Sequence, residues 1–292
     1  MKDIKGCGTA MVTPFAGEGV DYDALRRLVE LQKEAGIDFL VPLGTSAETP
    51  CLEDEEKREV LSFIRALVPG LPLIAGVGTN SLKATQRNIR LLEDCGADAW
   101  LVVVPFYNKP TQEGMYQYFK AISESTDKPI VMYNVPSRTG SNMSAETTLR
   151  LSLLPNVLGI KEASGDLNQI YHILDGRPEG FKLFSGNDDQ TYPIMAAGGD
   201  GVISVVSNIA PEPMLALTGA LRSGDMETAK ALDKKLSGLY KACFVESNPI
   251  PVKGGLAALG LCSDEMRLPL TPATSATVKL MMEAYERVRQ IF

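Results

Sequence analysis

The chain has 292 residues, a formal net charge of −7 and a hydrophobic content of 45%. This length suits one large domain or two modest ones, and the composition is that of an ordinary soluble globular protein. The negative charge argues against nucleic-acid binding, and no apolar run approaches the roughly 20 residues that span a membrane. Residues 1–11 also lack the apolar core of a signal peptide, so we expect a cytoplasmic protein.

The sequence contains five cysteines and a single histidine. The cysteines are scattered and never form a CxxC pair, which is typical of free thiols in a reducing compartment. His172 lies within LNQIYHIL, a predicted helix away from any strand end. A Ser-His-Asp triad or a histidine-rich metal site would have to be built around this one residue, so we expect neither metal nor cofactor. Acid–base chemistry should instead come from lysine, tyrosine, carboxylate or hydroxyl groups.

Short apolar segments recur along the chain, and a helical pattern follows each of them. Several of these segments are continuous apolar runs, which is typical of parallel strands covered on both faces. The predicted strands span 7–15, 38–44, 72–78, 99–106, 129–135, 157–163, 181–186 and 201–206. Among the intervening segments, the helix predicted from Glu53 carries its apolar residues on one stripe.

Eight strands that alternate with helices over roughly 220 residues predict an α/β fold, the (β/α)8 or TIM barrel. The competing fold is a doubly wound open sheet, which usually carries a GxGxxG turn after an early strand. That motif is absent, and residues 75–80 (AGVGTN) match only half of it. After Gly224 the alternation stops and the spacing becomes helical. We therefore predict a catalytic barrel over 1–224 and a C-terminal helical region over 225–292, packed on the barrel or on a neighbouring subunit.

Lys161 follows an apolar run in VLGIKEASG (157–165), a segment that is predicted to be a buried strand. Lysine is seldom fully buried, and an ammonium group in apolar surroundings tends to lose its proton. The resulting neutral amine is a nucleophile. The alternative is a side chain that reaches water past the end of the strand.

The active site of such a barrel lies at the carboxyl ends of its strands. The predicted strand ends carry one amine, two phenols, a pair of hydroxyls and one guanidinium. These groups belong to Lys161, Tyr107, Tyr133, Thr45, Ser46 and Arg138. The set suits Schiff-base chemistry, in which an amine attacks a ketone, hydroxyls relay protons and an arginine holds a carboxylate.

Each of these residues also has a purely structural interpretation. Tyr133 alone could belong to the core, Arg138 could form a surface ion pair, and Thr45 with Ser46 could cap a helix. Their joint placement at strand ends favours the chemical interpretation. The loops after the last two strands contain three aspartates and no lysine or arginine, which disfavours a phosphorylated substrate and favours a small carboxylate.

Six longer motifs resemble the dihydrodipicolinate synthase family of bacterial lysine and diaminopimelate biosynthesis. They are GTSAE (44–48), PFYNKP (105–110), YNVPSRTG (133–140), GIKEASG (159–165), GVISV (201–205) and FVESNPIPVK (244–253). The likeness covers nearly the whole chain. It implies a barrel enzyme, usually a homotetramer, that condenses pyruvate with L-aspartate 4-semialdehyde through a lysine Schiff base to give 4-hydroxy-tetrahydrodipicolinate.

The resemblance assigns catalytic roles to four residues. Lys161 resembles the lysine that forms the Schiff base with pyruvate, and Tyr133 resembles the tyrosine that moves protons during imine formation and cyclisation. Thr45 and Tyr107 match the relay partners of that tyrosine. In the family the second relay tyrosine comes from the adjacent subunit, so we expect Tyr107 to act across an interface.

The resemblance also implies four substrate-binding residues. Ser46 stands where the family usually has a second threonine that binds the pyruvate carboxylate, and it keeps the hydroxyl. Ile203 matches the residue whose backbone faces the keto acid, Gly186 lines the same pocket, and Arg138 matches the arginine that binds the semialdehyde carboxylate. One departure is Ala47, where the family commonly has glycine. If that position needs a positive φ, alanine costs about 1 kcal/mol there.

Two other activities of the same superfamily share the lysine and the tyrosine, namely N-acetylneuraminate lyase and 2-keto-3-deoxy sugar acid aldolase. Arg138 within SRTG and the NPIPVK segment (248–253) favour the synthase. A third interpretation is a catalytically silent relative that only binds keto acids. The presence of all four residues that resemble catalytic ones argues against it.

Feedback-regulated members of this family bind lysine at a subunit interface, away from the active site. At the matching positions this chain keeps Asn80 but has Ala84 in place of an acid, Lys57 in place of histidine and Phe106 in place of tyrosine. Losing one charge-assisted partner costs roughly 1.5–3 kcal/mol, so we expect lysine to bind only weakly. The alternative is that acidic residues within 53–56 replace the missing acid.

Overall fold

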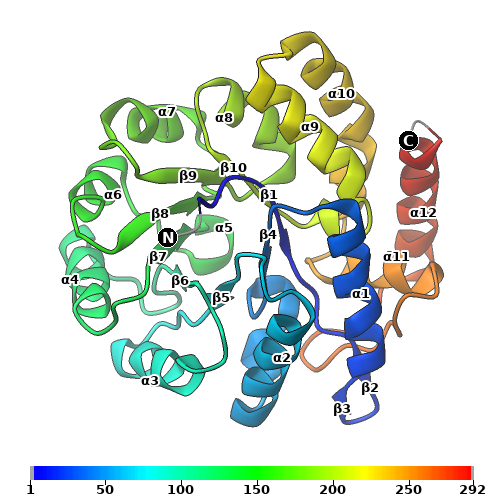
Figure 1. The fold of residues 1–292 in the computed structure, drawn as a ribbon, viewed down its shortest axis with the longest axis horizontal. Helices are drawn as coiled ribbons and strands as arrows, with labels where there is room; N and C mark the ends of the chain where they lie inside the picture. The colour runs from blue at the N-terminus through cyan, green and yellow to red at the C-terminus, as the bar shows by residue number, and fades with distance from the viewer. Residues whose placement is uncertain (1–2, 291–292) are drawn as a thin grey trace.

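The computed structural model describes residues 3–290, and eight parallel strands form the centre of this part of the chain (Figure 1). They are β1 (Gly6–Ala10), β4 (Phe39–Val41), β5 (Ile74–Gly76), β6 (Ala99–Val103), β7 (Ile130–Asn134), β8 (Val157–Glu162), β9 (Lys182–Ser185) and β10 (Gly201–Ser204). They pair in the order β4-β1-β10-β9-β8-β7-β6-β5, and a parallel bridge between Leu40 and Leu73 joins the two ends of the sheet. The sheet is therefore a barrel, and the predicted fold class is confirmed.

Helices cover the outside of the barrel and alternate with its strands (Figure 1). They are α1 (Tyr22–Ala35), α2 (Asp54–Leu67), α3 (Leu82–Leu92), α4 (Gln112–Ser123), α6 (Ala145–Leu151), α7 (Leu167–Gly176), α8 (Thr191–Ala196) and α9 (Pro211–Ser223). A short antiparallel hairpin of β2 (Phe15–Ala16) and β3 (Gly19–Val20) precedes α1, and the single turn α5 (Pro136–Thr139) follows β7 directly.

Side-chain and backbone caps explain where the first two helices begin and end. The Asp21 carboxylate accepts a hydrogen bond from the Ala24 N–H at 2.9 Å, which starts α1. Gly36 ends the same helix with a φ of 80°, a left-handed conformation that glycine adopts without strain. Glu53 is the N-cap of α2 and forms a capping box with Glu56, so the predicted helix start at Glu53 is confirmed.

The observed strands are shorter than the apolar runs that predicted them. The run 7–15 contains β1 only as far as Ala10, and the run 38–44 contains β4 only as far as Val41. Pro42 follows β4 directly and has no N–H to continue the ladder. Residues after the strand ends nevertheless stay buried, because the loops at this rim pack over the barrel. A continuous apolar run therefore overestimates strand length here.

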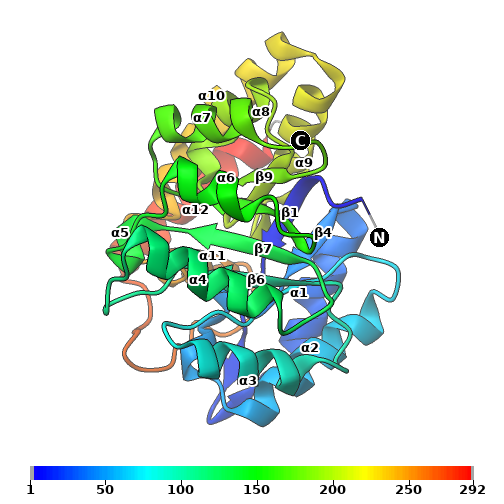
Figure 2. The ribbon, with the colours of Figure 1, turned by 90° about the vertical axis from the view of Figure 1, so that its left-hand side faces the viewer.

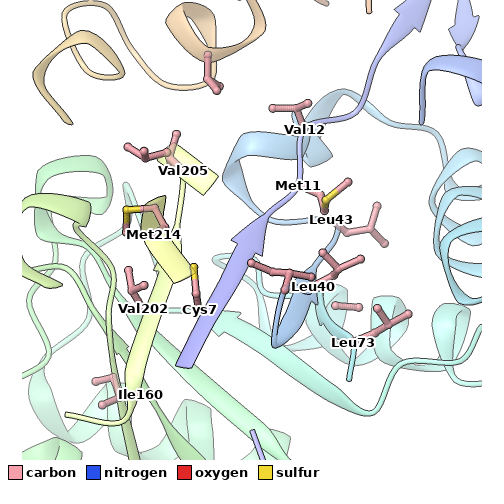
Figure 3. Packing of buried hydrophobic residues seen from close by; sticks show 14 of the residues in the cluster. Cys7, Met11, Val12, Leu40, Leu43, Leu73, Ile160, Val202, Val205 and Met214 are labelled. Carbon is pink, nitrogen blue, oxygen red and sulfur yellow. The ribbon is translucent and has the colours of Figure 1, made fainter. Parts of the chain in front are cut away.

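Alternate strand residues face two different apolar layers. The layer between strands and helices contains Cys7, Leu40, Ile160 and Val202 (Figure 3). The barrel interior holds a second cluster, in which the rings of Phe39 and Phe184 meet edge to face at 5.5 Å. Because successive side chains of a strand point to opposite faces, the outward position of Ile160 directs Lys161 into the barrel.

Three further helices follow α9. They are α10 (Met226–Ala242), α11 (Ile250–Ala258) and α12 (Ser275–Arg289). The helix α10 packs on α8 and α9, and α12 packs on α10 and α11. Figure 2 shows that the carboxyl end of β7 points toward the side of the barrel where α5 lies. Across residues 3–290, the structure has no helix that combines the length and apolar character of a membrane span.

Two glycines provide a matched test of the barrel packing. Gly201 begins β10 opposite Gly6, and a Cβ there would lie 2.0 Å from the Gly6 carbonyl oxygen. We expect Gly201→Ala to lower the free energy of unfolding by about 1–3 kcal/mol, because the two strands must move apart. Gly219 lies in α9, where apart from the adjacent residues and the helix's own backbone no atom of residues 3–290 lies within 4 Å of such a Cβ, so Gly219→Ala should instead stabilise by about 0.5–1 kcal/mol. Urea unfolding followed by circular dichroism measures both, and a Gly201→Ala protein as stable as the wild type would contradict this account.

Candidate active site

A cavity of about 510 Å³ lies at the carboxyl ends of the barrel strands. Six of the eight residues predicted for the site line it, and these are Thr45, Ser46, Tyr133, Arg138, Lys161 and Gly186. They come from the ends of β7 and β8 and from the segments that follow β4, β7 and β9. The barrel thus brings together groups that are far apart in the sequence.

Lys161 lies inside the barrel near the end of β8, with only 5% of its surface exposed. Tyr133 is its neighbour on β7, and the Lys161 Nζ lies 4.4 Å from the centroid of the tyrosine ring. Gly186 leaves room for the lysine, because a Cβ at that position would lie 3.2 Å from Lys161 Cε and 2.6 Å from the Cβ of Ala163. The amine therefore reaches the cavity, and the alternative of a side chain extending into water is wrong.

A buried carboxylate that sequence reasoning missed lies near this lysine. Asp188 is 1% exposed, and its carboxylate accepts hydrogen bonds from the Ser204 hydroxyl and from the N–H groups of Val205 at 2.9 Å and Val206 at 3.3 Å. Burial raises the pKa of Asp188, and these hydrogen bonds and the positive charge of Lys161 oppose the rise. The sequence identified Asp188 only as a loop acid, since nothing local shows that it ties the β9 loop to β10.

The turn after β4 is a short 3-10 helix, η1 (Thr45–Ala47), that places Thr45 and Ser46 at the cavity. The Ser46 hydroxyl accepts a hydrogen bond from Asn248 Nδ2 at 2.9 Å. Arg138 donates from Nη2 to the Asn248 carbonyl at 3.3 Å. Asn248 therefore connects two predicted binding residues and lines the cavity itself. Sequence reasoning missed this role, because residues 46 and 248 are 202 positions apart.

The structure answers the question that Ala47 raised. Left-handed backbone occurs on either side of this turn, at Leu43 with a φ of 57° and at Glu48 with a φ of 53°, but Ala47 does not adopt it. The Ala47 side chain is buried within the turn. Alanine in place of the glycine that is common in the family therefore carries no backbone penalty at this position.

The remaining two predicted residues do not line the cavity. Tyr107 is 90% exposed, and its φ of 66° places it in the left-handed region, which is uncommon for a bulky side chain. Ile203 is fully buried on β10 among the apolar side chains of the barrel interior. From the segment after β10, it is Val205 that contributes to the cavity lining. The structure thus brings neither Tyr107 nor the Ile203 side chain to the surface of this cavity.

A second, mainly apolar cavity of about 540 Å³ adjoins the first, and Thr45, Tyr133 and Arg138 line both. Its far side includes Lys57 and Ala84, two of the positions that the resemblance associates with lysine binding. The Lys57 ammonium lies 3.2 Å from the Asp54 carboxylate. Within residues 3–290, no group of three or more histidine, cysteine, aspartate or glutamate side chains is arranged to hold a metal ion.

The parallel barrel, with a lysine and a tyrosine adjacent in the cavity at its carboxyl ends, defines a (β/α)8-barrel enzyme built around a buried amine. The model of the Dihydrodipicolinate synthetase family matches residues 3–287. The chain belongs to this family.

Known proteins similar to the chain match over almost their entire length. The 4-hydroxy-tetrahydrodipicolinate synthase of Thermotoga neapolitana is 48% identical, with 95% of this chain and 96% of that protein covered. The enzyme of the same name from Chlorobaculum parvum is 45% identical, with 96% of this chain and 97% of that protein covered. The crystal structure of dihydrodipicolinate synthase from Thermotoga maritima superposes with a TM-score of 0.96 at 45% identity, covering 98% of this chain and 99% of that one.

Proposed function

We propose that this chain condenses pyruvate with L-aspartate 4-semialdehyde to 4-hydroxy-tetrahydrodipicolinate, and that Lys161 forms a Schiff base with pyruvate. The observation that carries the proposal is the position of Lys161, which is buried in the cavity at the carboxyl ends of the strands and adjacent to Tyr133. The two relatives described above bear the name of this synthase and match over nearly the full length, which supports the same reaction here.

The reaction requires a neutral amine at Lys161, because only the unprotonated form attacks the keto carbon of pyruvate. A C–N bond forms and the keto oxygen leaves as water. The imine draws electrons, so the pyruvate methyl group loses a proton and an enamine forms. The enamine carbon bonds to the aldehyde carbon, whose oxygen takes up a proton and becomes the 4-hydroxyl. The amino group of the semialdehyde then attacks the imine carbon, which closes the ring and releases Lys161.

Three hydroxyl groups move protons in this scheme. Tyr133 exchanges protons with the reacting centre, and its ring position 4.4 Å from Lys161 Nζ supports this role. Thr45 lines the same cavity and relays the proton. Tyr107 is almost fully exposed, so we assign its hydroxyl to the cavity of a neighbouring subunit in a homotetramer.

The two carboxylate substrates occupy different depths of the cavity. Ser46, which is 2% exposed, binds the pyruvate carboxylate through its hydroxyl and N–H, and the backbone of Ile203 faces the keto group. Gly186 keeps this end of the cavity open. Arg138 is exposed at the rim, where its guanidinium binds the carboxylate of the semialdehyde.

The proposal also covers the domain organisation, the cellular compartment and the cofactor requirement of the enzyme. We propose a catalytic barrel over 1–224 and a C-terminal helical region over 225–292, of which α10 packs on α8 and α9. The two substrates are soluble metabolites, so we place the enzyme in the cytoplasm. None of the reaction steps above calls for a metal or an organic cofactor, because lysine supplies the electron sink by forming the imine.

Lys161 should carry the covalent adduct. Another lysine, Lys253, is also fully buried, but its ammonium is bonded to Glu48 and to the Glu265 carbonyl and it does not line the cavity. Incubation with pyruvate and borohydride, followed by peptide mass spectrometry, should therefore label Lys161. Lys161→Ala should lose the adduct and nearly all turnover, whereas Lys182→Ala, which changes a strand lysine outside the cavity lining, should keep the adduct. Labelling of any other lysine would contradict the assignment.

Arg138 should determine the affinity for the semialdehyde more than for pyruvate. A lost hydrogen bond to a charged group costs about 1.5–3 kcal/mol, so Arg138→Ala should raise the KM for the aldehyde about ten- to a hundredfold. Pyruvate trapping on Lys161 should persist in this variant. Arg138→Lys, which keeps the charge but not the two-pronged geometry, should give an intermediate KM. Loss of trapping together with normal aldehyde kinetics would mean that the two binding roles are reversed.

Lysine should inhibit this enzyme only weakly. Lys57 and Ala84 line the second cavity at positions that the resemblance associates with lysine binding, and neither side chain offers an anion for the ammonium group of the ligand. A steady-state assay with millimolar lysine should show little inhibition. The combined variant Lys57→His, Ala84→Glu and Phe106→Tyr should gain inhibition. Half-maximal inhibition of the wild-type enzyme at a sub-millimolar lysine concentration would show that neighbouring acidic residues replace the acid that is missing at position 84.

A further inference from the structure

A fully buried ion pair connects the turn after β4 to the C-terminal helices. Lys253 on α11 places its Nζ 2.7 Å from Oε1 of Glu48, and both side chains are 0% exposed. The same ammonium donates to the Glu265 carbonyl at 2.7 Å and lies 4.2 Å from the ring centroid of Phe15. The other carboxylate oxygen of Glu48 accepts from the Arg267 N–H at 3.0 Å. Both charges are thus paired and hydrogen-bonded.

Stability alone does not explain a pair of this kind. Removing two charges from water is costly, and well-packed apolar residues of similar volume often stabilise a core as well or better. Burial lowers the pKa of Lys253, and the hydrogen bond and charge of Glu48 oppose that change. Unlike an apolar contact, a hydrogen-bonded ion pair fixes the relative orientation of the segments that it joins. Each oxygen and each N–H needs its own partner in a suitable geometry.

The ion pair between Glu48 and Lys253 fixes the orientation of the Thr45–Ala47 turn. Glu48 follows this turn directly, and its N–H donates to the Thr45 carbonyl at 3.2 Å. Its φ of 53° is a left-handed conformation that costs a non-glycine residue free energy, so its surroundings must hold it there. The hydrogen bond between Ser46 and Asn248 connects the turn to the same C-terminal segment a second time.

We infer that Glu48 and Lys253 are positioning residues, and that their ion pair holds the hydroxyls of Thr45 and Ser46 in place against Lys161. The C-terminal helices therefore help to build the pyruvate end of the cavity, although Glu48 and Lys253 do not contact the substrate. This inference rests on the proposed function, because it assumes that pyruvate binds beside Lys161 and Ser46.

Three variants test the role of the pair. Glu48→Gln and Lys253→Met each remove one charge, and each leaves the partner charge buried without its counter-charge. The double variant Glu48→Gln with Lys253→Met removes both charges, so neither partner is left as an unpaired buried charge. It can therefore be assayed even if a single variant fails to fold. The matched control is Asp200→Asn, which breaks the ion pair with Arg177 at the amino-terminal end of β10.

We expect the pair variants to raise the KM for pyruvate about tenfold or more and to slow borohydride trapping at limiting pyruvate by a similar factor. The KM for the aldehyde should change less than twofold, and hydrogen exchange of residues 44–49 should increase. Asp200→Asn should lower the melting temperature without changing the pyruvate KM. Pair variants that lose stability but keep the wild-type KM and trapping rate would overturn the inference. An absence of any adduct in the wild-type protein would instead overturn the proposed function.

Discussion

Closure of a parallel sheet is the constraint on which the rest of this structure depends. The bridge between Leu40 and Leu73 joins the two end strands, so that the carboxyl ends of the eight parallel strands meet at one rim. Each strand is covered by helices outside and by side chains inside, which leaves the rim as the place where polar groups can gather. Lys161 lies at that rim with its chain neighbour Ile160 packed on the opposite face, so a single strand supplies both core packing and an amine that lines the cavity.

The electrostatics of the rim follow from burial. Few charges are removed from water there, and those that are have partners matched to their geometry. Asp188 is held by one hydroxyl and two N–H groups, and Glu48 by an ammonium and an N–H. Lys161 has an aromatic ring beside it, and among residues 3–290 it forms no ion pair like that of Lys253 with Glu48, which leaves its amine facing the cavity. Lys161 and Lys253 thus differ in their partners, which supports the proposed covalent role of Lys161 over one for Lys253.

The sequence predicted those parts of the structure that depend on local pattern. Continuous apolar runs indicated parallel strands, and strand ends located Lys161, Tyr133 and Thr45 at one cavity. The sequence could not predict contacts between distant segments, such as Asn248 with residue 46, because no local pattern specifies which loops meet. It also overestimated the length of β1, since the buried loops at the rim are as apolar as the strands. The left-handed backbone of Tyr107, with a φ of 66°, could not be predicted either, because a bulky side chain rarely adopts this conformation.

The ion pair that connects the Thr45–Ala47 turn to α11 has a consequence for the synthesis of the protein. Glu48 and Lys253 are 205 residues apart, and ribosomes add roughly 5–20 residues per second, so the partner of Glu48 is made about 10–40 s after it. The last barrel strand, β10, ends at Ser204, so all eight strands are made before Lys253, and until then the carboxylate of Glu48 lacks this counter-charge. The growing chain therefore carries Lys161, Tyr133 and the Thr45–Ala47 turn before it carries Lys253, the residue that we infer holds this turn in place. An incomplete chain released from the ribosome would keep the amine of Lys161 but lack the ion pair that connects the Thr45–Ala47 turn to α11.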